Sequence, residues 1–205
     1  MTARFLSEVL TPAVLAAQER AYGRSYPIPD QARPGGDALG EDERAFIAAR
    51  DSFYLATTSA SGWPYIQHRG GPAGFLRVLS PRQLGFADLR GNRQLVSTGN
   101  VEGDRRAALF LMDYPGRARL KLLGHARTVE ASADPALADR LAPTPRLRQQ
   151  VERVFLLDLV AYDWNCPAYI TPRYTEAEIR AATAPLRDRL AALEAELAAA
   201  RRQAT

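Results

Sequence analysis

Short strand-like segments separated by turn signals dominate the middle of this chain, and they limit its fold more than any other feature. Residues 53–58 combine aromatic and β-branched side chains, as strands do. Similar runs follow, with glycine, proline, asparagine or serine between most of them, at residues 63–69, 75–79, 84–88, 107–113, 118–123, 125–130 and 154–162. A parallel sheet would need a crossover helix between successive strands, and the central spacing leaves no room for one. The pattern therefore predicts an antiparallel sheet that closes into a barrel.

Patterns typical of helices flank this strand-rich region. Over residues 4–20 apolar side chains recur at helical spacing, and Pro12 is expected to kink or split that helix. Residues 26–40 are rich in proline and glycine and predict a loop, whereas residues 41–50 and 133–141 predict short helices. The predicted fold class is therefore mainly β with flanking helices.

An alanine-rich helix is predicted near the C-terminus, from Thr175 to about Arg202. Its apolar residues form one seam with spacings of seven, four, three and four, at Ile179, Leu186, Leu190, Leu193 and Leu197. Such spacing is typical of a coiled coil, although these residues cover barely two heptads. The helix is expected either to contribute to contacts between two copies or to pack on its own barrel.

Composition and charge narrow the kinds of protein that this chain can be. Cys166 is the single cysteine, so intramolecular disulfides and cysteine-based zinc sites are excluded, and two histidines do not predict a metal site. No apolar run approaches the ~20 residues that a membrane span needs, and the N-terminus has no apolar signal core. The basic residues are almost all arginine, without the long basic runs of nucleic-acid-binding proteins. We therefore predict a cytoplasmic protein that binds neither nucleic acid nor membrane.

The first candidate site is a polar strand end, where Gln67, His68 and Arg69 run into Gly70 and Gly71. Glycine lets backbone approach a flat ligand and leaves N–H groups to bind its edge, and the guanidinium of Arg69 could hold a phosphate bidentately. The alternative is a glycine bulge at a barrel corner beside a solvated arginine.

A second polar cluster follows the next strands, with Arg90, Asn92 and Arg93 ahead of Ser97 and Asn100. Arginine, amide and hydroxyl groups placed together after a strand predict an anion pocket, and the alternative is an ordinary polar turn. The two clusters support each other, because a phosphate commonly needs several donors.

A third cluster leaves the last predicted strand at Trp164 and Asn165. The indole could stack on a flat ring, with Asn165 donating a hydrogen bond nearby, or it could simply close the barrel end. His125 lies on an alternating strand and is interpreted as structural, and Cys166 has no evident activating base.

Taken in order, these segments resemble the pyridoxamine 5′-phosphate oxidase-like FMN-binding family. The matching segments are residues 53–58, 62–64, 67–71, 86–88, 91–94, 97–100 and 119–124, and residues 164–167 and 170–173 look like a subgroup of that family. The resemblance implies a split β-barrel homodimer with FMN at its interface. It divides the chain into an N-terminal helical and loop wrap (1–50), a split-barrel FMN-binding domain (51–172) and a C-terminal helix (173–205).

The resemblance also implies which residues bind the cofactor. Arg69, Asn92 and Arg93 would hold the FMN phosphate, with Ser97 and Asn100 in support. The full set that it implies is Gln67, His68, Arg69, Gly70, Gly71, Asp88, Asn92, Arg93, Ser97, Asn100, Trp164 and Asn165. The last two would approach the flavin, and they could come from the other subunit.

Two departures from the family bear on the reaction. The lysine that helps the oxidase to hold the FMN phosphate is absent, and so is the oxidase's C-terminal arginine motif for substrate. The resemblance therefore supports flavin binding better than oxidation of pyridoxamine phosphate. We expect an FMN-dependent oxidoreductase acting on an unknown small molecule, with NAD(P)H as a candidate hydride donor and no catalytic residue identified.

Three alternatives stay open at this point. The first is a flavin-binding protein without turnover, such as a stress-response carrier. The second is a haem-handling split barrel in which His68 or His125 ligates iron. The third is nucleic-acid binding through the arginines, which would have to weaken steeply with salt.

Overall fold

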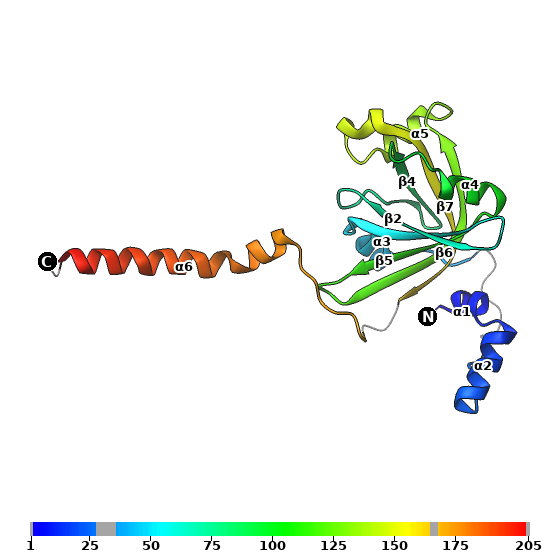
Figure 1. The fold of residues 1–205 in the computed structure, drawn as a ribbon, viewed down its shortest axis with the longest axis horizontal. Coiled ribbons are helices and arrows are strands. Elements are labelled where there is room, and N and C mark those ends of the chain that lie inside the picture. The colour runs from blue at the N-terminus through cyan, green and yellow to red at the C-terminus, as the bar shows by residue number, and fades with distance from the viewer. Residues whose placement is uncertain (1, 28–35, 165–167, 204–205) are drawn as a thin grey trace.

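The structure, a computed structural model, describes residues 2–27, 36–164 and 168–203. Its centre is a seven-stranded sheet in which all neighbouring strands are antiparallel, as predicted (Figure 1). In chain order the strands are β1 (Ser52–Thr58), β2 (Pro64–Gly70), β3 (Arg77–Ser80), β4 (Gln83–Leu89), β5 (Arg106–Asp113), β6 (Ala118–Glu130) and β7 (Val151–Trp164). They lie in the order β2-β1-β5-β6-β7-β4-β3, so the β1–β2 hairpin forms one edge next to β5 and the β3–β4 hairpin forms the other edge next to β7.

Helices occupy the flanks and the connections. They are α1 (Ala3–Val9), α2 (Pro12–Tyr22), α3 (Glu41–Ala48), α4 (Val96–Gly103), α5 (Pro135–Leu141), a 3₁₀ turn (Pro145–Gln150) and α6 (Glu176–Gln203). The predicted N-terminal helix is split at its proline, because Thr11 caps a new helix whose first residue is Pro12. The segment that follows the polar turn at residues 90–93 leads into α4.

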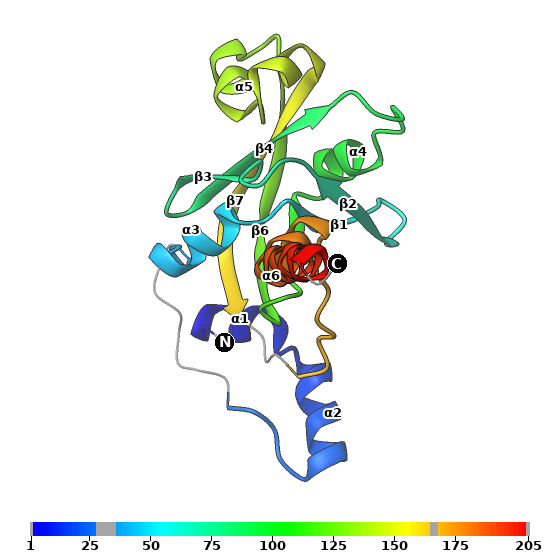
Figure 2. The same cartoon turned by 90° about the vertical axis from the view of Figure 1, so that its left-hand side faces the viewer.

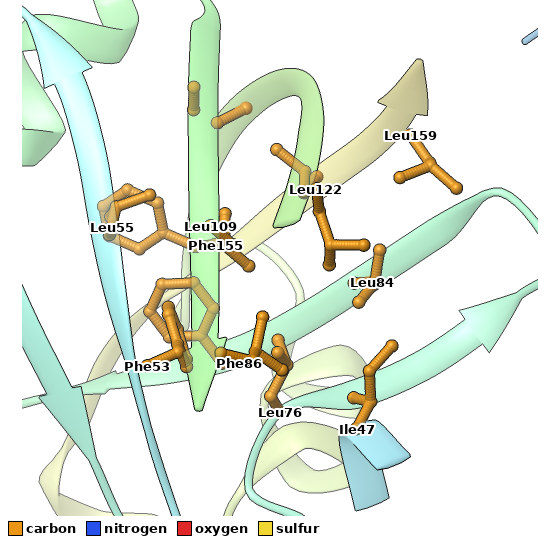
Figure 3. Packing of buried hydrophobic residues seen from close by; sticks show 14 of the residues in the cluster. Ile47, Phe53, Leu55, Leu76, Leu84, Phe86, Leu109, Leu122, Phe155 and Leu159 are labelled. Carbon is orange, nitrogen blue, oxygen red and sulfur yellow. The ribbon is translucent and has the colours of Figure 1, made fainter. Parts of the chain in front are cut away.

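The sheet curls on itself, and its aromatic core shows this directly. Three strands separate β1 from β4 in the sheet, yet Phe53 on β1 meets Phe86 on β4 edge to face, with ring centroids 5.1 Å apart. Phe86 also stacks on Phe155 of β7 at 5.0 Å, and all three residues are buried (Figure 3). Only a strongly curved sheet brings such distant strands together, so the fold is a split barrel, as predicted.

Several strand bounds differ from those predicted, and β7, for example, covers Val151–Trp164 where residues 154–162 were expected. Residues 75–79 were expected to form a strand, but β3 covers only Arg77–Ser80, because Phe75 and Leu76 turn into the core instead. Residues 118–130 form a single strand rather than two, with a shift in the β6–β7 register between Leu123 and Gly124.

Gly124 allows β6 and β7 to approach at that register shift. A Cβ atom at this position would lie 2.6 Å from the backbone oxygen of Asp158 and 2.8 Å from Cγ of Leu157. Because a backbone oxygen cannot move aside without moving its strand, Gly124→Ala is expected to lower the free energy of unfolding by about 1–3 kcal/mol. Denaturant unfolding checks this. Gly99→Ala in α4 is the matched control, since nothing lies near its Cβ position, and no loss of stability is expected there.

The helix α6 extends away from the sheet, and Figure 2 views it nearly end-on in front of the barrel. None of its residues is buried. In the parts of the chain that the structure describes, no helix is both long enough and apolar enough to cross a bilayer.

Candidate functional site

A polar cavity of about 200 Å³ lies where β2, the segment joining β4 to α4, and the start of β7 meet. We call it the β4–α4 cavity. Its lining residues are Tyr65, Gln67, Arg69, Asp88, Leu89, Gly91, Asn92, Arg93, Gln94, Leu95, Val96, Ser97, Thr98, Glu152 and Arg153. The two polar clusters that the sequence placed on separate strands thus lie on one cavity.

A nearly buried carboxylate between two guanidinium groups forms one wall of the cavity. Asp88 accepts from Arg69 Nη1 at 2.5 Å and from Arg153 Nη1 at 2.9 Å. The three side chains expose only 9%, 16% and 10% of their surface, respectively. The bridge ties β2 to β4 and β7 across the cavity, because Asp88 faces Arg153 in the β4–β7 register. Screening by water is weak at such burial, so each of these charges depends on its partners.

The ionisation of Arg153 follows from these contacts. Burial disfavours its charged form, but hydrogen bonds to Asp88 and Glu130 outweigh that effect and raise the pKa of its guanidinium. Arg153 therefore stays cationic in this wall.

Arg69 keeps donor capacity in spite of its ion pair. Its Nε atom is buried and has no hydrogen-bond partner within the described residues. The guanidinium lies over the faces of Phe155 and Phe86, 5.3 Å and 5.7 Å from the ring centroids, which orients its plane. A buried donor without a partner is costly, so this group fits a ligand that supplies an acceptor.

The N-terminus of α4 faces the same cavity. Leu95 occupies the N-cap position, and no side chain caps the helix. The first N–H groups of an α-helix have no intrahelical acceptor, and they carry the positive end of the helix dipole. Val96, Ser97 and Thr98, whose N–H groups are these, all line the cavity.

The loop ahead of α4 has an unusual backbone. Arg93 and Leu95 both have positive φ, +60° and +54°, which side-chain-bearing residues rarely adopt. Asn92 supports the loop by accepting a hydrogen bond from the Gln94 N–H at 3.1 Å. The Arg93 side chain makes no ion pair or hydrogen bond with any residue that the structure describes. Strain of this kind concentrates at ligand-binding segments.

Gln67 completes the cavity from β2. Its amide oxygen accepts from the buried hydroxyl of Ser97 at 2.8 Å. Because the oxygen is used in this way, the NH₂ group of Gln67 is the part left to bind a ligand.

The balance of charge in the cavity favours an anion. Its lining contains three arginines, Arg69, Arg93 and Arg153, and two carboxylates, Asp88 and Glu152, which leaves one net positive charge (3 − 2) before the helix terminus is counted. Backbone N–H groups and guanidinium forks together are typical of phosphate sites.

Of the twelve predicted cofactor-binding residues, the structure brings together in this cavity Gln67, Arg69, Asp88, Asn92, Arg93 and Ser97. Asp88 lies there as the partner of two arginines, whereas the prediction treated it as a cofactor contact. Sequence reasoning missed Arg153 and Tyr65. Arg153 could have been noticed in the sequence as a charged residue directly before the apolar run at residues 154–162. Its partner Asp88 follows only from the pairing of β4 with β7.

The structure does not bring His68, Gly70, Gly71 and Asn100 to the cavity. His68 lies on the opposite face of β2, because side chains alternate along a strand, and its ring meets Tyr54 at 5.6 Å. Gly71 packs against Phe75, and Asn100 donates to Thr57 Oγ1 at 2.9 Å.

Trp164 also lies outside the β4–α4 cavity. It is at the far end of β7 from Arg153, where its indole donates to Glu43 Oε1 at 2.7 Å and packs edge to face on Phe46. Within this chain its side chain is partly buried against the barrel core. Asn165 lies outside the described residues.

A second hollow of about 680 Å³ is bordered by β1, β2, β5 and β6, by Phe5 of α1 and by residues 169–171 and 173, and we call it the sheet-face hollow. Tyr54 and Ile66 there expose 40% and 65% of their surface, and the Arg119 guanidinium lies 6.0 Å from the centroid of the Phe110 ring. Apolar groups gathered on one exposed face are typical of an interaction surface.

The fold and the cavity define the class of this protein. It is a split-barrel protein with one curled antiparallel sheet, and a cavity rich in hydrogen-bond donors lies beside β2 and β4. Residues 39–157, more than half of the chain, match the family described as pyridoxamine 5′-phosphate oxidase. The chain therefore belongs to the pyridoxamine 5′-phosphate oxidase family, as the sequence resemblance indicated.

Solved structures include distant matches. HupZ from Group A Streptococcus is 12% identical, with 62% of this chain and 98% of that chain covered and a TM-score of 0.48. A putative pyridoxamine 5′-phosphate oxidase from Lactobacillus delbrueckii is 20% identical, with coverage of 65% and 99% and a TM-score of 0.48. A conserved protein from Mycobacterium tuberculosis is 17% identical, with coverage of 71% and 96% and a TM-score of 0.48. No curated protein matches the sequence.

Proposed function

We propose that this chain binds FMN with its phosphate in the β4–α4 cavity, and that it is a flavin-dependent oxidoreductase acting on a small molecule. The observation that carries the proposal is the convergence of donors on one cavity. Three groups that lack a partner among the described residues border it: the N-terminus of α4, the Nε atom of Arg69 and the Arg93 side chain. Membership of the pyridoxamine 5′-phosphate oxidase family supports a flavin as the anion's source.

The residues present fit the cofactor in charge and in hydrogen bonding. A phosphate would supply acceptors to the N–H groups of α4 and to the Arg69 guanidinium, and would balance the net positive charge of the lining. Gln67 would donate its NH₂ group to the cofactor, with its orientation fixed by Ser97. When bound, FMN supplies hydride and electron transfer, and the protein's part is to hold and orient it.

The proposal extends to a homodimer that pairs through the sheet-face hollow. The exposed side chains of Tyr54 and Ile66 support pairing there, since a second copy would remove them from water. A partner on this face would also lie near His68, whose ring contacts Tyr54 of the hollow. NAD(P)H is the proposed electron donor.

The test is the absorption spectrum of the purified protein after addition of FMN, riboflavin or haemin, followed by gel filtration. We expect flavin bands that co-elute with a dimer, and tighter binding of FMN than of riboflavin, which lacks the phosphate. Equal affinity for both flavins would contradict the phosphate assignment. A Soret band with haemin and no flavin binding would favour the haem alternative.

Turnover needs its own measurement, because flavin binding alone does not separate an enzyme from a carrier. Stopped-flow reduction of the FMN-loaded protein by NADH and NADPH is expected to bleach the flavin bands. A flavin-loaded sample that no donor reduces would point to the non-catalytic alternative.

Arg93→Gly offers a variant that separates ligand binding from folding. Glycine adopts positive φ without strain, so the change relieves the backbone while it removes the charge. We expect FMN affinity to fall about tenfold, as for the loss of one charge-assisted hydrogen bond. Thermal stability without ligand should stay within ~1 kcal/mol of the wild type. Isothermal titration and thermal unfolding of the same sample check both parts.

A further inference from the structure

The long helix α6 carries an apolar stripe that nothing in the described part of the chain covers. Five large side chains on one side of it are exposed, by 51% at Ile179, 72% at Leu186, 58% at Leu190, 44% at Leu193 and 51% at Leu197. The remaining residues of the helix are alanine or polar apart from Pro185, and none is buried. Side chains of this size rarely line up in water without a partner.

The stripe follows an alternating spacing of four and three residues once the whole helix is considered. In heptad notation, Thr183, Leu190 and Leu197 occupy position a, and the d positions are Ile179, Leu186, Leu193 and Ala200. The described helix thus holds three heptads of seam, more than the leucines alone indicate. Pro185 falls at position c, away from the seam, so its missing hydrogen bond does not interrupt the contact face.

The charges beside the seam fit a second copy of the same helix. In a parallel pair, position g of one helix faces position e of the next heptad on the other. Arg189 at g would face the partner's Glu194, and Glu196 at g would face the partner's Arg201, so both contacts join opposite charges. The same two contacts recur on the other side of the pair by symmetry.

An antiparallel pair fits less well. If Leu190 faced the partner's Leu193, then Ile179 would have no seam partner among the described residues of α6, Glu176–Gln203. The parallel arrangement instead places every seam residue opposite its own copy. It also leaves both sheets at the same end of the helix pair.

We propose that α6 pairs in parallel with α6 of a second copy of this chain, as a two-stranded coiled coil with Leu186, Leu190, Leu193 and Leu197 at its centre. The proposal does not depend on flavin binding or on pairing through the sheet-face hollow. It assigns to this helix the role of joining two subunits at a point remote from the β4–α4 cavity.

Disulfide trapping in the full chain tests the proposal. In a Cys166→Ser background, Leu193→Cys at position d is compared with Ala195→Cys at position f on the outer face. A parallel pair holds the two Leu193→Cys thiols within disulfide reach, so we expect them to cross-link at least tenfold faster under mild oxidation. Equal rates, or no cross-linking of Leu193→Cys, would overturn the proposal. Fast cross-linking only in a mixture of Leu190→Cys and Leu193→Cys chains would mean an antiparallel pair and would overturn it as well.

Charge reversal gives a second, independent test in the Leu193→Cys background. Glu194→Arg places like charges opposite Arg189 and should slow cross-linking several-fold. The double change Arg189→Glu with Glu194→Arg restores opposite charges and should recover the original rate. If the double variant cross-links as slowly as the single one, the flanking charges do not face each other as proposed.

Discussion

Asp88→Asn is expected to lower the free energy of unfolding by about 3–5 kcal/mol, because it leaves two nearly buried guanidinium groups without their shared carboxylate. Arg69 has no other carboxylate partner in the described structure, whereas Arg153 keeps Glu130 at 3.1 Å and Glu152 at 3.8 Å. For a chain of 205 residues, a loss of this size corresponds to a fall in Tm of roughly 6–20 °C. Thermal unfolding without added ligand measures it.

The matched control is Asp139→Asn. That carboxylate also pairs with an arginine, Arg148, but its side chain is 67% exposed. Exposed pairs contribute little, so a change within about 0.5 kcal/mol is expected. If Asp88→Asn is as mild as the control, the bridge across β2, β4 and β7 does not hold the cavity wall together.

Arg69→Ala is expected to raise the dissociation constant for FMN about 10–100-fold, the effect of losing hydrogen bonds from a charged donor. Riboflavin affinity should hardly change, since riboflavin has no phosphate, so the preference for FMN over riboflavin should collapse. The fold should survive, because Asp88 still accepts from Arg153. Fluorescence titration with both flavins gives the two constants.

Two further variants make the Arg69 result specific. Arg90→Ala removes a neighbouring arginine that is 59% exposed, is paired with Glu152 and does not line the cavity, so FMN affinity should stay within about twofold. Arg69→Lys keeps the charge but not the planar fork, and it should recover only part of the affinity. An unchanged FMN constant in Arg69→Ala would place the phosphate elsewhere.

The same residues thus contribute to stability and to the proposed site. Asp88 holds Arg69 in place, and one buried N–H of Arg69 has no partner among the residues that the structure describes. A ligand that supplies the missing acceptor would stabilise the folded chain by an amount that rises with the logarithm of its concentration relative to Kd. FMN is therefore expected to raise Tm more in the wild type than in Arg69→Ala.

Much of the fold followed from local patterns in the sequence. Alternating aromatic and β-branched runs predicted the strands, and their short connections predicted antiparallel pairing, which the structure confirms. Pro12 predicted the break between α1 and α2. These features depend on neighbours within a few residues, so the sequence contains the information directly. The strand predicted at residues 75–79 was wrong in its first half, because burial of Phe75 and Leu76 in the barrel outweighed their strand propensity.

The candidate site was predictable only in part. Arg69, Asn92 and Arg93 could be selected from the sequence because charged and amide groups next to glycine are poor core material. His68 was included through the family resemblance, although alternation along the strand places its side chain on the face opposite Gln67 and Arg69. The sequence offered no hint that Arg153, which is 65 residues from Asp88, completes the cavity wall.

By itself, then, the sequence determined that the fold is rich in strands, that the sheet is antiparallel and that the chain belongs to this family. It also identified the polar segments that we propose to bind a ligand. The tertiary structure decided which of those segments meet. Curling of the sheet brings β2 to β4 and β7, and pairing of β4 with β7 sets Asp88 against Arg153. Such contacts join residues distant along the chain, and their geometry follows from packing of the whole core rather than from any local pattern.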